Sequence, residues 1–163
     1  MADINYLRHS ERPDAALTEP ALREAIELLF FAYRDFTGEP DALLARHRFG
    51  RAHHRVIYFV GRQPGITVSE LLAILKITKQ SLAPVLKVLV ARGFVAQAMG
   101  AKDRRQRHLT LTEKGQALEE RLYHIQSARI ARAYRQADPA AIAGFRRVMR
   151  AITDDPQMGR GGR

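Results

Sequence analysis

A dense group of basic side chains between Thr78 and Arg107 is the part of the sequence best suited to binding another molecule. The segment holds seven lysines and arginines and a single acidic residue, Asp103, so it carries +6 of the chain's formal net charge of +10. A solvated surface loop usually mixes charges of both signs, whereas such a one-sided excess favours a polyanionic partner. The segment therefore predicts a surface that binds the phosphates of nucleic acid.

The basic side chains fall into two groups, each of which fits a different part of double-stranded DNA. Four polar residues, Thr78 to Ser81, precede apolar residues at helical spacing, which is the pattern of a helix that enters the major groove. In such a helix Gln reads adenine, and Lys reads guanine or holds a phosphate. The second group lies in a polar loop, and arginine in such a loop suits the negative potential of the minor groove. The expected DNA contacts are Thr78, Lys79, Gln80, Ser81, Lys87, Lys102, Asp103, Arg104, Arg105 and Arg107.

Short elements with clear boundaries would position these residues. Thr67-Val68-Ser69-Glu70 is a capping box that begins a short helix, and Thr78 is a second N-cap, before a helix that reaches Arg92 and stops at Gly93. Residues 94–98 and 108–111 predict two strands of a hairpin, with residues 99–107 as its tip. Pro84 interrupts the second helix, so we expect a bend between Gln80 and Pro84.

Longer helices flank this unit. Apolar spacing predicts a helix over residues 20–37, ended by Thr37-Gly38-Glu39-Pro40, with a further turn or two over 41–47. Other helices are expected over 51–62, from Thr112 to about Gln136, and from Pro139 to about Ile152. Residues 1–18 are expected to form a flexible arm, and residues 153–163 a disordered tail.

Composition excludes several classes of protein. The sequence has no cysteine, which removes disulfides and thiol chemistry, and no apolar run long enough to cross a membrane. The N-terminal residues lack the apolar core of a signal peptide, so we expect a cytoplasmic protein. Phosphate-binding, dinucleotide-binding and nucleophile-elbow motifs are absent, so we expect neither an enzyme nor a cofactor.

These residues resemble the MarR family of winged helix-turn-helix regulators. The resemblance rests on Asp103-Arg104-Arg105, on the run from His108 to Gly115 with its Leu-Thr-x-x-Gly, and on Leu89-x-x-x-Gly93-Phe94-Val95. The amino-acid sequence of residues 51–64 and 79–84 is similar to that of the PetP-like branch of the family. The resemblance implies that Arg105 enters the minor groove and that Asp103 fixes the hairpin tip. Peroxide-sensing members share the Pro84 pattern but need a cysteine, so that activity is not implied.

The predicted fold is mainly α-helical with a small β-hairpin wing. A winged helix-turn-helix core over about 51–115 lies within a single domain, residues 19–152, between dimerisation helices over about 20–37 and 113–152. A homodimer is predicted because the flanking helices offer more apolar surface than one small domain can bury. The expected interface residues are Leu22, Ile26, Leu118, Leu122, Phe145 and Met149.

Aromatic and histidine side chains suggest two kinds of additional site. Phe30, Tyr33, Phe36, His47 and His54 are candidates for an effector pocket, because the family resemblance implies small anionic aromatic ligands, although plain core packing is the commoner use of such residues. A metal site is less favoured because His53 and His54, adjacent on a helix, point about 100° apart. The other histidines considered for it are His47 and His124.

Two functions remain open from the sequence. One is a dimeric regulator that binds a palindromic operator and is modulated by a small ligand or partner. The other is a non-specific DNA-architectural or protein-interaction module on the same fold, and a metal-responsive regulator is a further variant. Both main classes bind double-stranded DNA with steep salt dependence, but only the first prefers one sequence strongly over random DNA.

Overall fold

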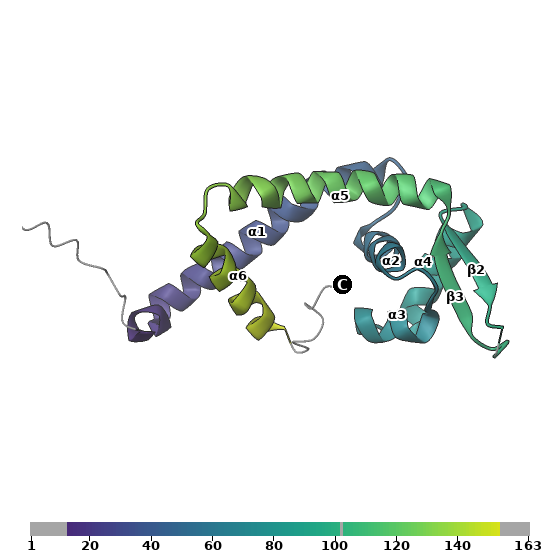
Figure 1. The fold of residues 1–163 in the computed structure, drawn as a ribbon, viewed down its shortest axis with the longest axis horizontal. Helices are drawn as coiled ribbons and strands as arrows, with labels where there is room; N and C mark the ends of the chain where they lie inside the picture. The colour runs from purple at the N-terminus through teal and green to yellow at the C-terminus, as the bar shows by residue number, and fades with distance from the viewer. Residues whose placement is uncertain (1–12, 102, 154–163) are drawn as a thin grey trace, which may run out of the picture. The chain divides into compact units, whose positions relative to one another are not determined.

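The protein is described by a computed structural model that covers residues 13–101 and 103–153 (Figure 1). The described residues divide into two compact units, one up to Glu39 and one from Pro40 onward. The expected tail after Thr153, most of the expected N-terminal arm and Lys102 lie outside the described residues.

Six α-helices and three short strands are found in the described residues. A 3-10 turn (η1, Pro13–Leu17) precedes α1 (Glu19–Ala45), which is followed by α2 (Arg51–Arg62), β1 (Ile66–Thr67), α3 (Val68–Leu75) and α4 (Lys79–Ala91). The chain continues through β2 (Val95–Met99), β3 (Arg107–Leu111), α5 (Glu113–Tyr134) and α6 (Pro139–Ile152). The mainly helical fold with a small wing is therefore confirmed.

The wing is a three-stranded antiparallel sheet in the order β1-β3-β2. Leu109 at the centre of β3 lies opposite Gln97 on one side and Ile66 on the other. The sequence predicted β2 and β3 but not β1, because two residues are too few to show an alternating pattern. β1 ties the wing to the start of α3, so the hairpin is part of the same packed unit as the helices.

The core of the second unit lies between the helices and the wing. Its most completely buried side chains come from α1, α2, α3, α4, β2, β3 and α5, and from Phe94 just before β2. Leu82, Leu86 and Leu89 bury one side of α4. The opposite side of α4 is therefore held facing outward.

The first helix continues past the point where the sequence predicted its end. α1 runs through Gly38 and Pro40 to Ala45, so the separate turn expected over 41–47 is part of it. A proline inside a helix costs about 3 kcal/mol, whereas fully burying one leucine contributes about 1.5–3 kcal/mol. Leu43 and Leu44 are both buried beyond Pro40, and together they offset the cost.

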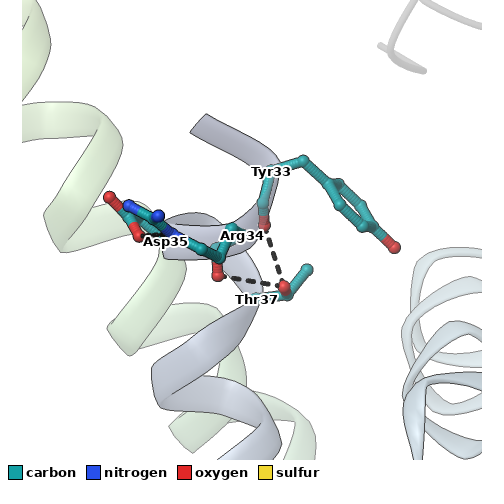
Figure 2. A network of polar contacts seen from close by, with 4 residues as sticks. All are labelled: Tyr33, Arg34, Asp35 and Thr37. Carbon is teal, nitrogen blue, oxygen red and sulfur yellow. Dashed lines mark hydrogen bonds and ion pairs between the residues drawn. The ribbon is translucent and has the colours of Figure 1, made fainter. Parts of the chain in front are cut away.

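The turn of α1 before Pro40 carries local polar contacts (Figure 2). The Thr37 hydroxyl donates to the carbonyl oxygen of Tyr33 at 2.8 Å, and it lies 3.2 Å from that of Arg34. Arg34 forms an ion pair with Asp35 at 2.8 Å.

Within residues 13–101 and 103–153, none of the helices combines the length and the apolar character needed to cross a bilayer.

Candidate nucleic-acid interface

The first turn of α4 is fixed by a cap that uses two of the predicted DNA contacts. Thr78 Oγ1 accepts a hydrogen bond from the backbone N–H of Ser81 at 3.2 Å, and the two hydroxyl groups are 3.0 Å apart. Lys79 and Gln80 are exposed beside this cap. The arrangement leaves the Lys79 and Gln80 side chains available to a ligand, while Thr78 and Ser81 hold the helix end.

The tip of the wing is a tight turn organised by Asp103. The Asp103 carboxylate accepts hydrogen bonds from the backbone N–H of Arg105 at 2.9 Å and from its Nε at 3.3 Å. The backbone N–H of Gly100 donates to the Gln106 carbonyl at 3.1 Å, which closes the turn. A Cβ at Gly100 would lie 2.6 Å from the Asp103 carbonyl oxygen, so only glycine fits there without a shift. The Arg105 side chain remains 92% exposed although it is paired.

The other side chains at the tip and base of the wing differ in the hydrogen bonds that hold them in place. Arg107 Nη1 donates to the carbonyl oxygen of Arg104 at 2.8 Å, and both arginines are exposed. His108, at the base of the tip, lies 2.8 Å from the Gly65 carbonyl through Nδ1, which must carry the proton because a carbonyl only accepts. This bond holds the wing to the turn before β1.

A cleft of about 560 Å³ lies between α3, α4 and the wing. Four basic residues line it, and none of the lining residues in the described part of the chain is acidic; Val68, Leu72, Leu82, Leu86 and Val90 are among its apolar lining residues. It thereby brings together residues from both predicted groups, which are far apart in sequence. The basic lining residues are Lys79, Lys87, Arg105 and Arg107.

Four further polar residues line the same cleft and were not predicted from the sequence. Thr67 and Ser69 belong to the capping box at the start of α3, where Thr67 is held by Glu70 at 2.8 Å. Gln97 and Gln106 come from the wing. Uncharged side chains do not contribute to the basic pattern of the sequence, although hydrogen-bonding groups beside cations are suited to base edges and phosphates.

Arg92 carries one of the positive charges of the basic segment but does not line the cleft. It caps the other end of α4, where its guanidinium group donates to the His47 carbonyl oxygen and lies 4.6 Å from the centre of the Phe49 ring. The net charge of +6 of the basic segment includes Arg92, although Arg92 is not among the expected DNA contacts. The structure uses its side chain within the protein.

The residues proposed for an effector pocket are divided between the two units. Phe30, Tyr33 and Phe36 belong to the first unit, where Phe30 and Tyr33 are exposed. His47 and His54 belong to the second unit and are half-buried. The pocket stays a prediction, because nothing in either unit by itself brings the five side chains together.

His47, His53 and His54, near the start of α2, are half-buried. His53 stacks on Phe49 with ring centres 4.8 Å apart, and its Nδ1 accepts a hydrogen bond from the Gly50 N–H at 3.1 Å. Burial is the main cause that lowers the pKa of His47, His53 and His54, and Arg92 lowers the first two further. Within the described ranges, no three His, Asp or Glu side chains gather closely enough to hold a metal ion.

The predicted dimer residues are of two kinds. Leu22, Ile26 and Phe145 are exposed in the isolated chain, and Met149 is half-buried. Leu118 and Leu122 are only 3% and 1% exposed, because one face of α5 packs into the core of its own unit. The assignment of Leu118 and Leu122 to an interface between copies was therefore wrong.

Comparison with known proteins identifies the family. The model of the MarR family matches residues 49–106, which span the start of α2 to the tip of the wing. The HTH-type transcriptional regulator PetP of Rhodobacter capsulatus is 51% identical over 138 residues, which cover 85% of this chain and 83% of that protein. This identity confirms the predicted similarity to the PetP-like branch.

Solved structures show the same fold. FabT of Streptococcus pneumoniae, in complex with DNA, superposes with a TM-score of 0.70 at 20% identity and covers 78% of this chain and 92% of its own. BpsR of Bordetella bronchiseptica, whose DNA binding is regulated by 6-hydroxynicotinic acid, gives a TM-score of 0.62 at 21% identity, with 80% and 99% covered. The chain belongs to the MarR family of DNA-binding transcriptional regulators and is not an enzyme.

Proposed function

We propose that the protein binds a palindromic DNA operator as a homodimer, with α4 in the major groove and the wing in the minor groove. The observation that carries this proposal is the cleft between α4 and the wing, whose charged lining residues are all basic. Lys79 and Gln80 at the exposed start of α4 suit base edges, and Lys87 suits a phosphate. Arg105, exposed at the tip, suits the narrow minor groove.

Exposed apolar surface supports the second copy. Among the described residues, sixteen large apolar side chains are exposed in the isolated chain, and twelve of them lie on α1, α5 or α6. A stable interface buries about 800 Å² on each partner, and a soluble monomer rarely leaves so many large apolar groups in contact with water. We therefore assign the interface to Leu22, Ile26, Phe145 and Met149, without the buried α5 leucines.

Two-fold symmetry would place the two α4 helices one turn of DNA apart, roughly 34–36 Å. A small ligand or partner that favours another spacing would release the operator by shifting the population of dimers. The regulation of BpsR by 6-hydroxynicotinic acid supports an effector of this kind.

We further propose that residues 19–152 act as one functional domain. Because the regulator must reach the chromosome, we place it in the cytoplasm.

A selection experiment tests the function. Duplexes are selected from a random-sequence library by the full chain, and their affinity is compared with that of unselected duplexes of equal length. We expect an enriched palindrome bound at least a thousandfold more tightly than random DNA, as specific sites typically are. Recovery of no common sequence, with equal competition by random DNA, would favour the non-specific architectural module instead.

A further inference from the structure

At the end of α4, Arg92 contacts two segments that are distant from it in sequence, the turn after α1 and the start of α5. α4 ends at Ala91. The C-cap residue Arg92 donates its backbone N–H to the Val88 carbonyl at 3.0 Å, and Gly93 then turns the chain with φ of +73° into the wing. Any change at Arg92 therefore acts on the helix proposed to read DNA and on the first strand of the wing together. Its side chain and its carbonyl oxygen have different partners.

The side chain of Arg92 reaches the turn that follows α1. Its Nη1 donates to the carbonyl oxygen of His47, while the guanidinium plane lies over Phe49 at 4.6 Å and near Phe94 at 5.7 Å from the ring centres. Phe49 and Phe94 contact each other edge to face at 5.1 Å. A planar guanidinium donates through its edge while its face covers a ring, which a lysine ammonium cannot do.

The backbone at the same point is attached to the start of α5. Lys114 Nζ donates to the Arg92 carbonyl at 3.0 Å and lies 4.4 Å from the centre of the Phe94 ring. Thr112 Oγ1 donates to the Gly93 carbonyl at 2.6 Å. These bonds satisfy carbonyl groups that the end of a helix leaves without partners.

We infer that Arg92 is a positioning residue that fixes the orientation of α4 relative to the end of α1 and the start of α5, and so sets DNA specificity without touching DNA. The inference rests on the proposed function, because α1 and α5 belong to the helices proposed to hold the second copy. Arg92 is absent from the lining of the basic cleft. Specific binding needs both recognition helices in register, whereas non-specific binding needs only positive charge.

The test uses Arg92→Lys in the full chain, with duplexes selected by the unchanged protein and random duplexes of equal length. Arg92→Lys keeps the charge but loses the arrangement over Phe49. We expect affinity for the selected duplex to fall about tenfold or more, while affinity for random DNA and the salt slope stay unchanged. Arg135→Lys, an exposed arginine beyond the end of α5, is the matched control and should change neither affinity.

A second variant separates positioning from simple stability. Phe49→Leu removes the ring under the guanidinium and keeps an apolar side chain, so the double variant with Arg92→Lys should lose little more specificity than either single variant. All affinities are measured well below the unfolding midpoint of each variant. Additive losses, or a variant that is unfolded at the assay temperature, would show that Arg92 acts on stability and would overturn the inference.

The remaining outcomes are distinct from each other. Equal weakening on both duplexes, with a shallower salt slope in Arg92→Met, would make Arg92 a phosphate contact. Unchanged discrimination by Arg92→Lys would overturn the positioning role and leave the proposed function standing. If the unchanged protein itself shows no preference for selected DNA, the proposed function fails and the positioning role fails with it.

Discussion

Gly115 lies where the first turn of α5 meets the carbonyl group of Phe94. A Cβ at this position would overlap that carbonyl oxygen and press on Leu111. The Thr112 N–H donates to the same carbonyl at 3.1 Å, and Thr112 Oγ1 accepts from the Gly115 N–H, also at 3.1 Å. The Leu-Thr-x-x-Gly run therefore has a physical reason: the threonine caps α5 and binds the end of α4, and the glycine permits the approach.

Gly115→Ala should lower the free energy of unfolding by about 1–3 kcal/mol, because a buried backbone oxygen cannot move aside easily. Chemical denaturation of the variant and the unchanged protein measures the difference. Gly38→Ala in α1 is the control, since nothing lies within 4 Å of a Cβ there. It should be neutral or stabilise by up to about 1 kcal/mol. Equal effects at the two glycines would contradict the packing argument.

Arg105 and Lys87 are expected to contribute to DNA binding in different ways. Arg105→Ala should weaken binding to the selected operator strongly, because an arginine in the minor groove has both charge and shape complementarity. Lys87→Ala, on the exposed side of α4, should weaken all duplexes similarly and reduce the salt slope by about 1. Titrations at several salt concentrations distinguish them. Normal operator binding by Arg105→Ala would remove the wing from the proposed interface.

Pro84 is the point at which α4 departs from a regular helix. It lies inside the helix and lacks the N–H that would bond to the Gln80 carbonyl. The bend expected from this gap stays a prediction. Pro84→Ala should raise the free energy of unfolding by about 1–3 kcal/mol and change the preferred operator, because the first turn would be redirected. If the variant selects the same sequences as the unchanged protein, the proline has no part in recognition.

The start of α2 and the turn before it should make stability depend on pH. The folded pKa values of His47, His53 and His54 are below their ordinary value of 6.5, chiefly through burial. Between those lowered values and 6.5 the unfolded chain binds more protons than the folded one. The stability that depends on these three histidines is thus fully present above pH 6.5, and it falls as the pH drops below that value.

Denaturation between pH 7.5 and 5.5 measures this dependence. The free energy of unfolding should decrease toward pH 5.5 in the unchanged protein and decrease less in His54→Gln, which removes one of the three proton-binding groups from the folded core. Stability that stays constant over the whole range would mean that the three imidazoles do not titrate differently in the two states.

Local sequence signals predicted most elements of the DNA-binding unit. Thr67 and Thr78 cap helices as expected, and Thr112 and Asp138 cap α5 and α6 in the same way, because an N-cap acts through a hydrogen bond only three residues away. Local sequence signals did not predict the features that are determined by packing between residues distant in sequence. The continuation of α1 through Pro40, the burial of Leu118 and Leu122, and the attachment of Arg92 to Phe49 all depend on neighbours far along the chain.

At the scale of the whole molecule, polar and apolar surfaces are assigned to different helices. The charged residues that line the cleft belong to α4 and the wing, whereas most exposed large apolar side chains belong to α1, α5 and α6. A chain that binds DNA with one set of elements and a second copy with another can couple the two events. The coupling requires that the second set actually holds a dimer.

Ile26 on α1 and Phe145 on α6 provide the direct test, because both are exposed in the isolated chain, at 56% and 48%. Sedimentation of the unchanged protein at micromolar concentration should show a dimer. Ile26→Asp or Phe145→Asp should produce monomers, since an interface that buries an unpaired carboxylate loses several kcal/mol. Tyr58→Asp, at an exposed apolar residue of α2, is the matched control and should remain dimeric. The monomeric variants should also lose most of their preference for a palindrome while still binding random DNA. A dimer that survives both substitutions would place the interface elsewhere on the chain.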